Sequence, residues 1–181
     1  LANDNLDSII VASDICNRLG MDTISAGACV AFTIECTENG ILAKEDTSGL
    51  DMTWGNHKAI IALTEMLGRR EGFGDVLADG VKIAAERIGK DSERYAMHIG
   101  GQEIAAHDPR GGWGFATGYG ADPTPGRHNQ GGGQHPPGLI EDVDRTERKG
   151  RGLFHKTSTN YMHAASALGL CQFVIGSYPH V

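Results

Sequence analysis

The sequence has few of the features that mark secreted, nucleic-acid-binding or membrane-spanning proteins. Its four cysteines, Cys16, Cys29, Cys36 and Cys171, form no CxxC pair, so neither a disulfide framework nor a zinc ribbon is indicated. Lys and Arg form no long run, and the net charge of -7 would repel phosphate backbones. No apolar stretch approaches the roughly 20 residues that span a bilayer. We therefore expect a soluble, cytoplasmic protein that binds neither nucleic acid nor membrane.

The composition is that of a folded chain with long, closely fitted loops. Hydrophobic residues make up 40% of the 181 positions, which is enough for a sizeable core. The cysteines are expected to be small hydrophobic members of that core. Glycine is abundant at 26 residues, and most of the excess lies between Gly100 and Gly152. Glycine at that density indicates loops that approach another group closely.

Apolar residues recur at helical spacing through the first ninety residues. The expected helices span residues 3–19, 24–38, 56–67 and 75–88. Residues 95–104 alternate briefly and predict a short strand or an extended linker, which makes the region near residue 97 the expected domain boundary.

The second half of the chain has a different character. Residues 107–138 are rich in glycine and proline, and a loop of this length either lies in solvent or surrounds a ligand. Helix is expected again from about Lys156 to Leu168 and after Cys171. The sequence therefore predicts a mainly α fold with two helical subdomains, residues 1–97 and 98–181, and a long Gly/Pro-rich loop in the second.

One short motif occurs twice in the sequence, at Asn17–Asp22 and at Ser166–Cys171. Both segments follow the pattern polar-x-Leu-Gly-apolar-(Asp or Cys) at the end of an expected helix. Gly20 and Gly169 would let the backbone turn tightly, which leaves carbonyls and flanking polar groups free to bind a heterocycle. A Leu-Gly helix ending is common, so the pattern alone does not establish a binding site.

The two copies of this motif resemble the paired pterin-binding motifs of the aldehyde ferredoxin oxidoreductase family. Further segments resemble family landmarks in the right order, and together they cover nearly the whole chain: Cys16–Gly27, Ala31–Glu35, Glu38–Gly40, Gly74–Gly80 and His107–Arg110. The resemblance implies an enzyme in which two pterin dithiolenes hold one tungsten or molybdenum beside a [4Fe-4S] cluster. It also implies that this chain is a piece of the second and third domains.

The resemblance carries cofactor roles onto the matching residues. The expected contacts to the bis-molybdopterin are Asn17, Gly20, Asp22, Ser166, Gly169 and Leu170. Two of them depart from the family, which usually has Asp where this chain has Asn17 and Ser166. A neutral hydrogen bond replaces a charge-assisted one at both places, so these contacts should be weaker.

The resemblance also assigns a metal ligand and a catalytic residue. Cys171 matches the position at which one distant cysteine completes the [4Fe-4S] cluster, while the other three ligands and a β-rich domain lie upstream of this chain in the family. His128 matches a loop histidine beside the metal, where it could act as a general acid. Glu35 is expected to be solvated or capping, and Asp108 and Arg110, like His107, are expected to be structural.

The expected activity of the intact protein is oxidation of an aldehyde to a carboxylic acid, with ferredoxin as electron acceptor. One alternative is a related tungsten enzyme that reduces a carboxylic acid or an aromatic thioester. Another is a truncated module that binds no cofactor. The resemblance further suggests a homodimer for the intact protein, and residues 107–138 would discriminate the substrates through the size of the pocket.

Overall fold

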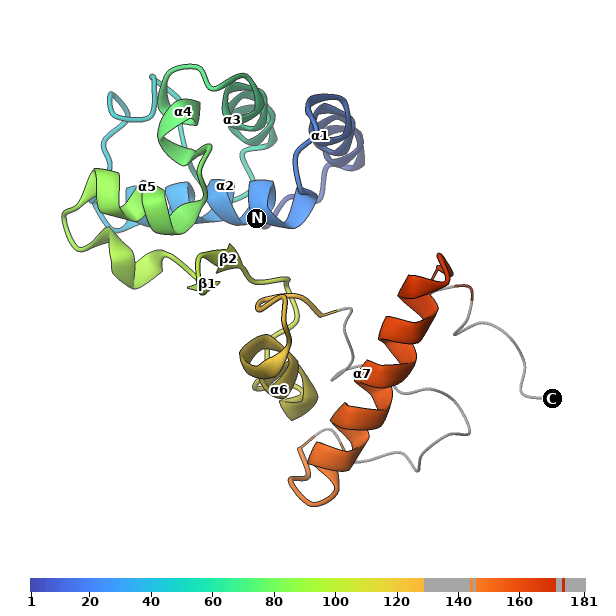
Figure 1. Ribbon diagram of the computed structural model, residues 1–181. Coiled ribbons are helices and arrows are strands. Elements are labelled where there is room, and N and C mark those ends of the chain that lie inside the picture. Colours follow the sequence, from blue (N-terminus) through green and yellow to red (C-terminus); the bar gives the residue numbers. More distant parts are fainter. Residues whose placement is uncertain (129–143, 145, 172–173, 175–181) are drawn as a thin grey trace. The chain divides into compact units, whose positions relative to one another are not determined.

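The computed structural model describes residues 1–128, 144, 146–171 and 174, and it is mainly helical, as expected (Figure 1). The chain divides into two compact units, Leu1–Glu103 and Ile104–Val181, which we call unit 1 and unit 2. The division falls after residue 103, a few residues beyond the expected boundary near residue 97. The added residues form a hairpin that packs on unit 1.

The first two helices begin and end where their capping residues predict. Helix α1, Leu6–Leu19, begins after Asn5, whose side chain accepts a hydrogen bond from the Ser8 N–H at 2.9 Å. Helix α2, Thr23–Glu38, begins in the same way after Asp22. Side-chain caps of this kind satisfy amides that have no partner inside the helix.

The expected helix over 75–88 is wrong, because the structure divides this stretch into two helices. Helix α3, His57–Arg69, is followed by α4, Phe73–Leu77, and α5, Val81–Ile88. The break is at Gly80, which has a φ of 89°. The carboxylate of Glu103, which is distant in sequence, accepts a hydrogen bond from the Val81 N–H at 2.7 Å and so caps α5.

Helix α2 forms the centre of unit 1. It contacts α1, α3, α5, the 3-10 helix η1 (Ser92–Tyr95) and the strand β2 (Gln102–Glu103). In Figure 1 it runs between α1 and α3 on one side and the hairpin of β1 (His98–Ile99) and β2 on the other. Side chains of α2 that are almost fully buried include Cys29, Val30, Phe32, Ile34 and Cys36. Because α2 is apolar around most of its circumference, it must be covered on several sides, as the structure shows.

Unit 1 ends in a small hairpin. The 3-10 helix η1, Ser92–Tyr95, leads into β1, His98–Ile99, which pairs antiparallel with β2, Gln102–Glu103. Gly100 and Gly101 both have positive φ, 62° and 96°, as a tight two-residue hairpin turn requires. The short strand expected between residues 95 and 104 is therefore confirmed.

Replacement of Glu103 by alanine should destabilise unit 1 by about 2 kcal/mol, because it leaves the buried Val81 N–H without its charged acceptor. The free energy of unfolding would be measured by urea titration with Trp54 fluorescence, in a Trp113→Phe background. Glu93→Ala, at an exposed carboxylate of η1, is the matched control and should change stability little. Equal stability of the two variants would contradict the capping role of Glu103.

Unit 2 contains a helix inside the segment expected to be a loop. Helix α6, Trp113–Ala121, lies within residues 107–138. The segment was expected to be a loop because it is rich in glycine, and glycine destabilises an isolated helix. Packing supports the helix instead, because Gly114, Gly118 and Tyr119 are buried in unit 2.

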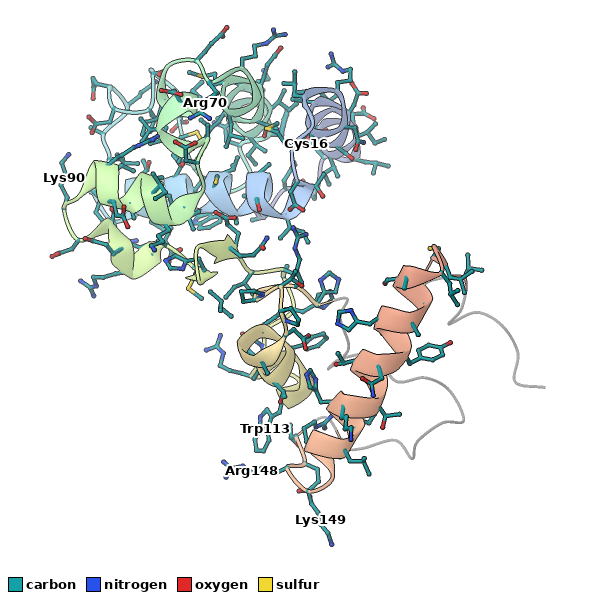
Figure 2. All side chains as sticks on the ribbon, in the orientation of Figure 1. Cys16, Arg70, Lys90, Trp113, Arg148 and Lys149 are labelled. Carbon is teal, nitrogen blue, oxygen red and sulfur yellow. The ribbon has the colours of Figure 1, made fainter. Side chains whose placement is uncertain are left out.

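The last helix begins earlier than expected. Helix α7, Arg151–Ala167, starts five residues before Lys156, and Phe154 in its first turn is buried. Just before it, the guanidinium of Arg148 lies 5.2 Å from the centre of the Trp113 ring (Figure 2). The helix expected after Cys171 and the last part of the Gly/Pro-rich loop lie outside the described residues.

In the described part of the chain, no single helix is long and apolar enough to cross a membrane. Helices α1 and α2 reach the required length and composition only together, and the chain bends by 120° between them.

Candidate functional site

The first of the two matched motifs forms a tight turn between α1 and α2. Gly20 has a φ of 70°, and both its N–H and the Met21 N–H point back to the Cys16 carbonyl, the latter at 2.9 Å. This pairing closes the helix end with a left-handed glycine. A Cβ on Gly20 would meet nothing within 4 Å, so backbone conformation alone accounts for the glycine.

The second motif forms a similar turn at the end of α7. Gly169 has a φ of 73°, and the Leu170 N–H donates to the Ala165 carbonyl at 2.9 Å, the same five-residue span as in the first turn. Gly169 also has open space around it. The motif that repeats in the sequence therefore forms a similar turn twice in the structure, once in each unit.

Both turns leave their polar ends on the surface of their own unit. The exposed residues are Asn17, Gly20 and Asp22 in unit 1, and Ser166, Gly169, Leu170 and Cys171 in unit 2. Amide, carboxylate and hydroxyl groups in this arrangement offer the donors and acceptors that a pterin ring requires. The residues thus fit such a group by chemistry and by accessibility.

We expect Asn17 and Ser166 to face one cleft in the intact protein. That expectation concerns the placement of one unit against the other, so it stays a prediction. Within unit 1, the Asp22 carboxylate already accepts a hydrogen bond from the Ser25 N–H through Oδ1, so the α2 cap fixes its position.

The cysteines fall into two classes. Cys16, Cys29 and Cys36 are buried in unit 1, as expected for small hydrophobic residues, whereas Cys171 is exposed. Burial raises the pKa of the Cys29 thiol to about 12 and that of Cys36 to about 11. Burial thus favours the neutral thiol at these positions. Among the described residues, no three His, Cys, Asp or Glu side chains are grouped to hold a metal ion.

A thiol-reactive probe should therefore label the 181-residue chain once at pH 8. Cys171 is expected to react quickly because it is exposed, and the three buried cysteines should react only when the chain unfolds. Absorbance of the released thionitrobenzoate gives the count, and all four thiols should react in guanidinium chloride. Fast labelling that persists in Cys171→Ser would contradict this assignment.

His128 lies half-buried in unit 2, against the ring of another histidine. The ring centres of His128 and His107 are 4.5 Å apart. Burial lowers the pKa of His128, and the nearby His107 and Arg127 lower it further. These effects favour the neutral imidazole. Its Nδ1 is buried and has no hydrogen-bond partner in the described part of the chain.

Helix α6 supports His107 from the other side. The Phe115 ring stacks on His107 with centres 5.1 Å apart, and the Tyr119 hydroxyl donates to the His107 carbonyl at 2.9 Å. His107 thus has the structural role expected of it. Arg110 pairs with the Asp108 carboxylate, and this interaction lowers the pKa of Asp108 to about 2.

One buried pair in unit 2 has no signal in the sequence. Oδ1 of Asp122, at the end of α6, lies 3.1 Å from Nε2 of His155 on α7, and the two side chains are only 3% and 13% exposed. The pair was not predicted, because a separation of 33 residues carries no spacing signal for such a contact. Only the packing of α6 on α7 brings the two side chains together.

Unit 1 also has a cavity of about 800 Å³ beneath α1. Its lining is largely apolar and includes Ile9, Cys16, Val30 and Ile60. Asn17, Gly20 and Asp22 do not line it, although Cys16 and Thr23, which flank them in the chain, do.

The chain is similar to known proteins over a range that includes both turns. Residues 1–180 match the family described as "Aldehyde ferredoxin oxidoreductase, domains 2 & 3". A tungsten-containing aldehyde ferredoxin oxidoreductase of Pyrococcus abyssi is 37% identical over 131 residues, which is 71% of this chain and 21% of that protein. An aliphatic sulfonate oxidoreductase, WOR-like subunit, of Pyrococcus furiosus is 36% identical over 108 residues, covering 58% of this chain and 17% of the relative. The chain thus spans about a fifth of the curated relatives that it matches.

A solved structure has a similar fold. The active site complex BamBC of benzoyl coenzyme A reductase superposes with a TM-score of 0.50 at 23% identity, over 85% of this chain and 26% of that one. At this identity the likeness concerns the fold alone.

Proposed function

Because this chain belongs to the aldehyde ferredoxin oxidoreductase family, we propose that the complete protein oxidises an aldehyde to a carboxylic acid and passes the electrons to ferredoxin. The reaction converts an aldehyde and water into a carboxylate, three protons and two electrons. The single observation that carries the proposal for this chain is the repeated turn, with Gly20 at 70° and Gly169 at 73°. Two matched turns with exposed polar ends suit one cofactor that has two similar halves.

The residues that would hold a bis-pterin cofactor are those of the two turns. Asn17 and Asp22 would bind one pterin, and Ser166 with the Gly169–Leu170 backbone would bind the other. The cofactor supplies a tungsten or molybdenum that exchanges two electrons with the substrate. Cys171, exposed beside the second turn, would be the ligand that this chain contributes to a [4Fe-4S] cluster.

His128 would take part in proton transfer in this reaction. Burial and His107 lower its pKa, which favours the neutral ring, so the ring would readily give up a proton that it had taken from the reacting group. The buried Nδ1, which has no partner in the described part of the chain, is the atom we assign to this task. The contact with His107 keeps the ring in one place.

The experiment that tests the proposal is a substrate panel on the complete protein, purified without oxygen and supplied with tungstate. Aldehyde-dependent reduction of ferredoxin should greatly exceed turnover with the competing substrate classes. The panel should include a carboxylic acid and an aromatic thioester, each with reduced ferredoxin, and an aliphatic sulfonate. If the protein turned over one of these substrates and oxidised no aldehyde, the proposed reaction would be wrong, and the protein would catalyse another reaction of the same family.

A further inference from the structure

The buried pair of Asp122 and His155 has no part in the proposed function. Its hydrogen bond joins α6 to α7 in surroundings that are almost dry. Burying a carboxylate is costly unless it is paired, and a well-packed apolar pair is often at least as stable as a buried polar one. A gain in stability is therefore a weak explanation for the presence of this pair. A hydrogen bond between two buried side chains also fixes their orientation relative to each other.

We propose that Asp122 and His155 are positioning residues that hold the segment ending at His128. This inference rests on the proposed function, since it concerns the residue to which that function assigns proton transfer. Asp122 is the first residue after α6, and the chain runs from it through Pro123 and Pro125 to His128.

The backbone geometry shows how the pair would act. The Asp122 N–H still donates to the Gly118 carbonyl at 3.0 Å, but its ψ of 152° turns the chain away from the helix. Every later residue of the segment depends on that one exit direction. By tying the Asp122 side chain to His155, α7 fixes the direction at its origin.

The far end of the segment is held separately. The His128 ring lies against His107, which Phe115 and Tyr119 in turn hold to α6. The segment is thus anchored at both ends to the helices of unit 2. Two anchors of this kind restrict the position of the His128 ring more than either could alone.

Helix α6 leaves the space that the pair needs. A Cβ on Gly118 would lie 3.3 Å from Oδ2 of Asp122 and 3.8 Å from Cε1 of His155, so even an alanine would press on the carboxylate. Thr159 Oγ1 lies 3.5 Å from the same ring nitrogen of His155 and flanks the pair from α7.

The test compares two replacements of His155 in the complete protein. Glutamine can still donate an N–H to Asp122, whereas leucine fills similar volume and cannot. We expect His155→Leu to lower kcat for aldehyde oxidation about 10-fold or more with KM unchanged, because small misplacements of a reacting group are costly. His155→Gln should restore kcat to within about threefold of the parent. His163, exposed on the same helix, supplies the matched controls His163→Leu and His163→Gln, which should both turn over normally.

A second readout needs no turnover. In the 181-residue chain labelled with ¹⁵N and ¹³C at histidine, His155→Leu should shift the ring signals of His128, and His155→Gln should leave them nearly unchanged. Fluorescence of Trp113, in α6, reports that unit 2 is folded in each variant. If His155→Leu does not fold, Asp122→Leu, which has a similar shape and cannot accept the hydrogen bond, takes its place in the same comparison.

The outcomes separate this inference from the proposed function. Unmoved His128 signals in His155→Leu or Asp122→Leu would overturn the positioning role, whatever the complete protein oxidises. Equal loss of kcat in His155→Gln and His155→Leu would also overturn it, and would give His155 acid–base chemistry of its own. Shifted His128 signals that glutamine restores would uphold positioning even if the complete protein oxidised no aldehyde.

Discussion

His128→Ala in the complete protein is expected to lower kcat for aldehyde oxidation about 10²-fold, the usual loss when a general acid or base is removed. The ring is half-buried and neutral at pH 7, and its Nδ1 has no partner in the described part of the chain. It contributes no ligand to the cofactor in the proposed arrangement. Tungsten content should therefore remain that of the parent.

The measurement is steady-state turnover with ferredoxin, normalised to tungsten per chain. His163→Ala, which removes an exposed imidazole from α7, is the control and should retain parental turnover. Unchanged turnover of His128→Ala at full tungsten occupancy would make His128 an ordinary loop residue. Loss of tungsten in that variant would make it a structural support of the cofactor.

Gly74→Ala is expected to destabilise unit 1 by about 3 kcal/mol or more, near the upper end for overpacked sites. Gly74 lies in α4 directly against the end of α3. A Cβ there would lie 2.2 Å from the carbonyl carbon of Met66 and 2.4 Å from the Leu67 nitrogen. Backbone atoms of a helix cannot yield as a flexible side chain can, so α4 would have to move away from α3.

Gly27→Ala is the matched control for this variant. Gly27 lies within α2, and a Cβ added there would meet nothing within 4 Å, so alanine should stabilise the helix by about 0.5–1 kcal/mol. Urea unfolding followed by Trp54 fluorescence, with Trp113 replaced by phenylalanine, gives both free energies. A Gly74→Ala chain as stable as Gly27→Ala would show that α4 does not pack closely on α3.

Local signals in the sequence were sufficient for the helices of unit 1 that carry their own caps. Asn5 and Asp22 begin α1 and α2, and Gly20 separates them, so each boundary depends on residues close by in the chain. The break before Val81 could not be predicted in this way. It depends on a carboxylate 22 residues later, Glu103, which only the folded hairpin brings to α5.

Unit 2 was harder to predict because packing overrides its composition. Glycines made residues 113–121 look like a loop, yet Gly114 and Gly118 are small residues buried within the unit. The pair of Asp122 and His155 had no local pattern at all, since it joins two helices across a long connection. The matched turns at Gly20 and Gly169 were predictable because each is encoded within a few residues.

If these two turns hold one bis-pterin cofactor, as we propose, the purified complete protein should contain both the metal and the pterin. Elemental analysis and assay of released pterin, on protein produced with tungstate and molybdate, should give one metal and two pterins per folded chain. Gly20→Val and Gly169→Val, which strain the left-handed positions at 70° and 73°, should each lower that content, whereas Gly27→Ala should not. A folded complete protein with neither metal nor pterin would show that the two turns hold no such cofactor, and would favour the alternative of a module that binds none.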